Sequence, residues 1–135
     1  MATWEDVRRI ALGLPETTER GSHDGLAAWR VRDKMFVWER PLRKADHEEL
    51  GEAAPPGPIL GVRVPDLGAK QALLTGDPEI CFTTAHFDGY PAVLVRLERV
   101  PVTELEELVV EAWLARAPKR LARDYLAAAR PTGPA

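Results

Sequence analysis

The spacing of apolar residues changes along the chain, and each change predicts a different kind of element. Residues 4–13 carry an apolar stripe at helical spacing, and Thr3 with Asp6 forms a pattern typical of a helix N-terminus. We therefore expect a first helix that ends at Gly13. The polar stretch 16–25 that follows is either a loop or a short edge strand.

Alternating apolar and polar positions predict an antiparallel sheet in the middle of the chain. Residues 27–32 and 34–39 alternate on either side of Asp33, which is typical of a β-hairpin. Similar strand patterns return at residues 59–64, 80–84 and 92–100. The charged, proline-rich residues 41–58 are expected to form a mobile connection, with one helical turn at 45–50.

Helical spacing returns twice in the second half of the chain. Asp66 is a typical cap for a short helix over 67–75, which would bury its leucines. Thr103 with Glu106 predicts the start of a longer helix, and a proline separates it from a last helix over 119–129.

This order of elements indicates an α+β fold rather than a parallel β-α-β fold. We expect a two-layer sandwich in which an antiparallel sheet of about five strands carries the N- and C-terminal helices on one face. Residues 1–130 would form this single domain, followed by a flexible tail over 131–135.

The composition restricts the class of protein. The chain has 135 residues, a formal net charge of −3 and 45% hydrophobic residues, which suits one soluble domain with its own core. It has no apolar run of the roughly 20 residues that span a bilayer and no signal-peptide pattern. We therefore expect a cytoplasmic protein that does not bind membranes. The single cysteine, Cys81, falls in an apolar strand pattern typical of a buried side chain.

Motifs for cofactor or metal chemistry do not occur in the sequence. Neither the P-loop pattern nor the dinucleotide-binding glycine pattern is present, and no His or Cys pair has zinc-ligand spacing. We therefore expect no cofactor and no metal. No nucleophile stands with a base and an oxyanion donor, so the pattern does not indicate an enzyme.

Charges are unevenly distributed along the chain. Residues 20–44 contain seven Lys and Arg against three Asp and Glu, and residues 116–130 contain five against one. If the two segments lie on the same side, they would form a basic face on an acidic protein, a candidate surface for nucleic acid. Trp29, Phe36 and Trp38 interleave with the hairpin cations and either stack on bases or face the core.

Residues 86–90 are the best candidate for a site of specific chemistry. They bring His86, Asp88 and Tyr90 into one turn, where Gly89 permits a left-handed backbone. The alternative is a plain hairpin turn, in which Asp88 bonds its own backbone and the two rings only pack.

Several segments together resemble the MmcQ/YjbR family of small bacterial proteins, and the resemblance spans nearly the whole chain. They are Lys34-Met35-Phe36, Leu73-Leu74 with Asp77-Pro78, and the run from Phe82 to Val95. The resemblance implies a frataxin-like (CyaY-like) α+β sandwich and a DNA-binding role. As site residues it points to Lys34, Lys70, His86, Tyr90, Lys119 and Arg120.

Two hypotheses of different classes follow. The first is non-catalytic DNA binding, with phosphate contacts from Arg30, Arg32, Lys34, Lys70, Lys119 and Arg120. The second is binding of a small molecule or a protein on the sheet face near Trp38, His86, Asp88 and Tyr90. We expect a monomer or a weak homodimer, with DNA as the candidate partner. A continuous basic face would favour the first hypothesis, and a pocket lined by the turn would favour the second.

Overall fold

The structure, a computed structural model, describes residues 2–21 and 25–129. In these ranges, five helices and six strands follow one another, with two short 3-10 helices between them. In chain order the elements are α1 (Trp4–Leu12), β1 (Thr17–Gly21), β2 (Ala27–Val31), β3 (Lys34–Glu39), α2 (Lys44–Leu50), η1 (Gly51–Ala53), β4 (Ile59–Arg63), α3 (Leu67–Gly76), β5 (Cys81–Phe82), η2 (Ala85–Phe87), β6 (Ala92–Arg96), α4 (Val102–Arg116) and α5 (Lys119–Ala129).

The six strands form one antiparallel sheet in the order β1-β2-β3-β4-β6-β5. This confirms the α+β class and extends the expected sheet by an edge strand. The added strand is β1, which pairs with β2 in register from Thr17 opposite Val31 to Gly21 opposite Ala27. None of its residues is fully buried, so its sequence has no apolar alternation to distinguish a strand from a loop.

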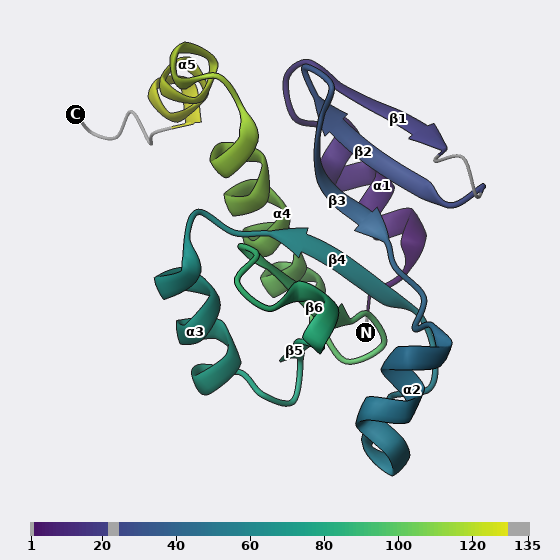
Figure 1. The fold of residues 1–135 in the computed structure, drawn as a ribbon. Coiled ribbons are helices and arrows are strands. Elements are labelled where there is room, and N and C mark those ends of the chain that lie inside the picture. The colour runs from purple at the N-terminus through teal and green to yellow at the C-terminus, as the bar shows by residue number, and fades with distance from the viewer. Residues whose placement is uncertain (1, 22–24, 130–135) are drawn as a thin grey trace.

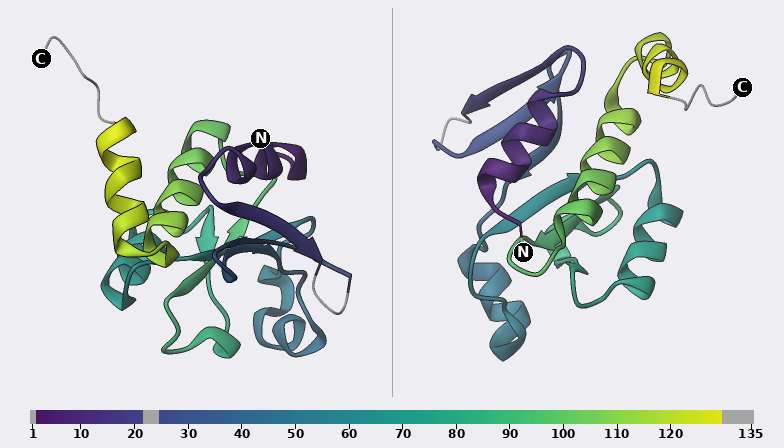
Figure 2. Two further views of the ribbon diagram at one scale, coloured as in Figure 1. Left: turned by 90° about the horizontal axis from the view of Figure 1, so that it is seen from above. Right: turned by 180° about the vertical axis from the view of Figure 1, so that it is seen from behind.

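Helices α1 and α4 cover one face of the sheet, as expected for the N- and C-terminal helices (Figure 1; Figure 2, left). Their apolar sides meet the strands in the main core, where Val7, Phe36 and Trp113 are fully excluded from solvent. The indole N–H of Trp113 donates to the carbonyl oxygen of Pro15 at 3.1 Å and ties α4 to the turn after α1. Helix α5 extends from the end of α4 and packs back through Tyr125, whose ring centre lies 5.0 Å from that of Trp113.

The opposite face of the sheet carries a smaller core of its own. Trp38 from β3, Leu94 from β6 and Phe87 from η2 are buried there, and Leu50 of α2 packs against them. The helical turn expected at 45–50 is confirmed, but the stretch 41–58 is more ordered than the expected mobile connection. It forms a seven-residue helix and a 3-10 turn that cover part of this second face.

The predicted helix caps are confirmed at two helices. Thr3 and Asp6 form the capping box of α1, in which the Thr3 hydroxyl accepts from the Asp6 backbone N–H at 3.3 Å. Asp66 caps α3 by accepting from the backbone N–H of Ala69 at 2.8 Å.

Other local predictions are wrong. Helix α4 begins at Val102, directly after Pro101, so Thr103 lies inside the helix and does not cap it. Leu67 is 51% exposed rather than buried, because it stands in the first turn of α3, away from the sheet. The last two strands are shorter than their patterns predicted. No helix in the described ranges is long and apolar enough to cross a membrane, and the predicted tail at 131–135 lies outside those ranges.

Candidate functional site

Two of the three cations predicted to bind DNA from the β2–β3 hairpin remain available for phosphates, and the third is neutralised by a carboxylate. Lys34 is exposed and Arg30 is half-buried, and neither forms an ion pair within the described residues. Within the described residues, the Arg30 guanidinium bonds only the carbonyl oxygen of Asp33, at 3.4 Å. Arg32 instead pairs with both carboxylate oxygens of Glu16. That hydrogen-bonded pair raises the pKa of Arg32 and lowers the pKa of Glu16.

Lys70 is buried beneath the turn at 86–90 rather than presented to solvent. It is 7% exposed, and its Nζ donates to the carbonyl oxygens of Phe87 at 2.6 Å and Tyr90 at 2.8 Å. Burial lowers the pKa of Lys70, and the nearby Asp88 carboxylate partly opposes that effect. The ammonium group therefore holds the turn in place, and we do not include it among the candidate phosphate contacts.

The C-terminal cations are exposed on α5. Lys119 and Arg120 begin the helix and Arg123 follows one turn later, and none of them is in an ion pair within the part of the chain that the structure describes. Helix α5 projects at the same end of the molecule as the β2–β3 turn, with a gap between them (Figures 1 and 2). The two basic segments thus share one end of the fold.

Two arginines add to the positive charge beside α5. Arg116 ends α4 and Arg63 ends β4. Burial, and after it the positive charge of Arg63, lowers the pKa of Arg116. The Arg63 guanidinium lies 4.7 Å from the ring centre of Tyr90 and donates to its hydroxyl at 2.6 Å. The Nε atoms of both arginines are buried and have no hydrogen-bond partner among the described residues. We call the set Arg63, Arg116, Lys119, Arg120 and Arg123 the cationic corner.

Sequence reasoning counted Arg116 in the second basic segment but missed Arg63. The strand pattern places Arg63 at the end of a strand, and nothing in that pattern shows that this end reaches α4. Only the register of β4 between β3 and β6 brings the two arginines together.

The residues of the second hypothesis do come together. Trp38, His86, Asp88 and Tyr90 line one open groove of ≈ 550 Å³ on the second face of the sheet. Trp38 forms its floor, opposite Gly61 of β4. A Cβ atom at Gly61 would lie only 2.3 Å from the indole, so the glycine is what lets the ring lie across the strand.

The aromatic rings around the groove contact one another through Phe87. Its ring centre lies 4.9 Å from His86, 6.2 Å from Tyr90 and 6.4 Å from Trp38. Trp29 and Phe36, by contrast, belong to the main core. The idea of a base-stacking surface built from all three hairpin aromatics is therefore wrong, since only Trp38 reaches the second face.

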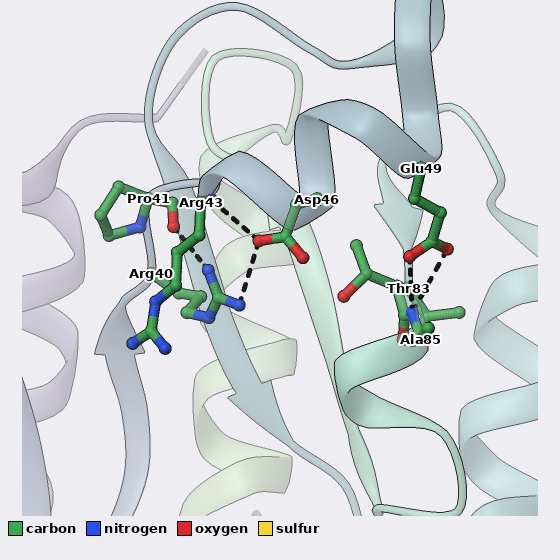
Figure 3. Close-up of polar contacts among 8 residues, drawn as sticks. Arg40, Pro41, Arg43, Asp46, Glu49, Thr83 and Ala85 are labelled. Carbon is green, nitrogen blue, oxygen red and sulfur yellow. Dashed lines mark hydrogen bonds and ion pairs between the residues drawn. The ribbon is translucent and has the colours of Figure 1, made fainter.

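Helix α2 braces the turn that borders the groove (Figure 3). The Glu49 carboxylate accepts from the backbone N–H of Ala85 at 2.9 and 3.2 Å. At the other end of the helix, Asp46 pairs with Arg40 at 3.1 Å, and both side chains are almost fully buried. Burial alone would raise the pKa of Asp46, but the backbone N–H of Arg43 and the charge of Arg40 hold it below the usual value.

The structure offers few groups for catalysis. Cys81 is 2% exposed, and burial raises the pKa of its thiol to about 12, so it is not a thiolate nucleophile at neutral pH. Among the described residues, no group of three or more His, Cys, Asp or Glu side chains is placed to hold a metal ion. The arrangement can bind anions at the cationic corner and planar groups in the groove.

Comparison with known sequences finds relatives that match almost the whole chain. Three relatives are each 56% identical over 130 residues, covering 94% of this chain and 98% of theirs. They are named as uncharacterized proteins: Mb2600 of Mycobacterium bovis, and MT2646 and Rv2570 of Mycobacterium tuberculosis.

A solved structure shares the fold. The Deinococcus radiodurans protein DR2400, assigned to the domain DUF419, superposes with a TM-score of 0.61 at 19% identity and covers 84% of this chain and 78% of its own. The sequence model of the YjbR family matches residues 12–115, from the end of α1 to the end of α4. The chain therefore belongs to the YjbR family.

Proposed function

We propose that this protein binds duplex DNA without catalysing a reaction, and that the cationic corner makes the principal phosphate contacts. The observation that supports this most is that the five corner cations have no ion-pair partner within the described residues, although the chain as a whole carries a net charge of −3. Cations left unpaired on an acidic protein are a typical footprint of a site for phosphates.

The charges along α4 are segregated in the direction that this proposal needs. The acidic residues Glu104, Glu106, Glu107 and Glu111 lie before the last turn, whereas Arg116 stands at the end that joins α5. A phosphate beside Arg63 and Arg116 would relieve the repulsion between their guanidinium groups and supply acceptors for their N–H donors.

The β2–β3 hairpin supplies a second, weaker contact in this proposal. Arg30 and Lys34 have no ion pair in the described part of the chain, but Arg32 and Arg20 are neutralised by Glu16 and Asp33, respectively. Since it lies at the same end as α5 but apart from it, the hairpin suits a neighbouring stretch of the same duplex (Figure 1).

The salt dependence of binding tests the proposal. If four cations contact phosphates, the slope of log K against log salt is expected to be about −3.6, because each contact contributes about 0.9. The double variant Lys119→Ala/Arg120→Ala should then bind more weakly and have a slope shallower by about 1.8. Fluorescence anisotropy of a labelled duplex between about 50 and 200 mM salt measures both quantities.

The matched control is Lys44→Ala/Arg99→Ala, which also removes two exposed charges. Lys44 lies in α2 at the end of the molecule opposite α5, and Arg99 borders a hollow with the residues that follow α2. It should bind DNA with a slope close to that of the wild type. Equal slopes for the two double variants, or no binding by the wild type at the lowest salt, would contradict the proposal.

A further inference from the structure

The groove on the second sheet face has the shape of a ligand site. No residue of the cationic corner lines it, although Arg63 of the corner contacts Tyr90 in its wall. Its volume, ≈ 550 Å³, falls within the range of small-molecule sites. Its floor is apolar, formed by Trp38 with Ala28 and Met35, and its wall is formed by His86 and Tyr90. Tyr90 is 42% exposed, so its ring presents a large aromatic surface to whatever enters.

The wall of the groove is held in place by more contacts than a connecting turn needs. Lys70 binds two of its carbonyl oxygens, Glu49 binds the backbone N–H of Ala85, and Arg63 binds the hydroxyl of Tyr90. From below, the Arg40 guanidinium lies 5.3 Å from the ring centre of Phe87. Burying charged groups to fix one turn has a free-energy cost, which is typical of a site whose geometry must be preorganised.

One lining cation, Arg43, has no ion-pair partner within the described residues. The groove is bordered by Arg40, Arg43, Glu39 and Asp88. Arg40 is paired with Asp46, and Glu39 accepts from the backbone N–H of Ala27 at 3.0 Å. The Asp88 carboxylate forms no ion pair within the described residues, and its charge partly opposes the lowering of the pKa of Lys70 by burial. The Arg43 guanidinium is turned away from Asp46 and bonds none of the residues drawn in Figure 3.

We propose that this groove binds a planar aromatic molecule that carries an anionic group. The ring packs over Trp38 and against the rings of His86 and Tyr90, and the anion, a carboxylate or a phosphate, lies against Arg43. The aromatic surfaces favour a planar ring over an aliphatic group, and the unpaired Arg43 guanidinium supplies charge-assisted donors for the anionic group. The proposal does not depend on DNA binding, since Arg43 is not part of the cationic corner.

Two pairs of probes test this chemistry on the full chain. One is 2-naphthoate against 2-naphthamide, and the other is adenosine monophosphate against adenosine; each pair keeps the ring and removes the charge. We expect at least one anion to bind about tenfold more tightly than its neutral analogue, as measured by titration calorimetry. The Arg43→Gln variant should lose that preference while binding the neutral probe as the wild type does.

Location and specificity are tested by two further controls. Lys44→Gln removes the neighbouring exposed charge, which does not line the groove, and should leave the preference unchanged. In nitrogen–proton spectra, the anion should shift the indole signal of Trp38 and not that of Trp113, which is fully buried in the main core.

Several outcomes would overturn the proposal. They are equal affinity for the charged and neutral members of both pairs, no binding of any of the four probes, a preference that survives Arg43→Gln, or an unshifted Trp38 signal. The comparison within the wild-type protein decides the question even if a variant is poorly folded.

Discussion

At the scale of single residues, two side chains act in ways that their residue type does not suggest. Gly61 stands in a central strand, where glycine ordinarily weakens a sheet, because the indole of Trp38 occupies the space of its missing side chain. Lys70 is buried and bonded to carbonyl oxygens of the 86–90 turn, although lysine is among the residues least often buried.

Substitution of Gly61 by alanine tests the first of these. The new methyl group would overlap the indole of Trp38, so the ring has to move and the second core has to repack. We expect the free energy of unfolding to fall by about 1–3 kcal/mol in urea denaturation. The control is Gly76→Ala at the end of α3, where a Cβ atom meets nothing within 4 Å. Equal stability of the two variants would show that the ring does not depend on the glycine.

These roles also mark a limit of sequence reasoning. The turn at 86–90 could be identified because its residues are adjacent in the chain and chemically distinctive. The resemblance to the MmcQ/YjbR family points to Lys70 as a DNA contact, which requires an exposed side chain. Its burial depends on how α3 packs beside the turn, and so on contacts between residues 17 to 20 positions apart.

At the scale of elements, most helices and strands were predictable from local periodicity, and the exceptions have physical reasons. The helix α2, of which only one turn at 45–50 was expected, has almost no apolar stripe, because its place is fixed by the buried pair of Asp46 with Arg40 and by Glu49. The edge strand β1 lacks apolar alternation because none of its residues is fully buried. In both cases tertiary polar contacts or edge pairing replace the hydrophobic signal.

The junction of α3 and α4 predicts a pH-dependent stability. Glu104 of α4 meets Asp77, which follows α3, and their shared hydrogen bond, with burial and repulsion, raises the pKa of Glu104 from 4.5 to about 7. A carboxyl with a raised pKa in the folded state binds its proton more tightly there than in the unfolded chain. The contribution of Glu104 to the free energy of unfolding is therefore fully present below pH 4.5 and is lost as the pH rises through about 7.

The variant Glu104→Gln keeps a hydrogen-bond donor but does not titrate. Between pH 4.5 and about 7, the melting temperature of this variant should fall less than that of the wild type. The difference in stability in favour of the variant should be largest above pH 7. Glu106→Gln, at an exposed position of the same helix, should follow the wild-type pH profile. Parallel profiles for the wild type and Glu104→Gln would contradict the assignment.

At the scale of the whole molecule, the fold separates acidic and basic charge. Acidic residues of α4 lie before its last turn, whereas the cationic corner lies where α4 meets α5. The sequence predicted two basic segments but not their relation, which depends on the sheet order and on the direction in which α5 leaves α4 (Figure 1). The structure places both basic segments at one end of the molecule. It also adds Arg63 to the second of them, where α4 meets α5.

Mapping of the DNA contacts by backbone amide shifts tests the central claim most directly. With a short duplex added at low salt, we predict the largest nitrogen–proton shifts at residues 116–123, smaller shifts at 30–34 and none at 44–53, the segment of α2 and η1. Those shifts should disappear as salt is raised, because the contacts are to phosphates. Shifts confined to residues 44–53, or no shifts at low salt, would contradict DNA binding by the cationic corner.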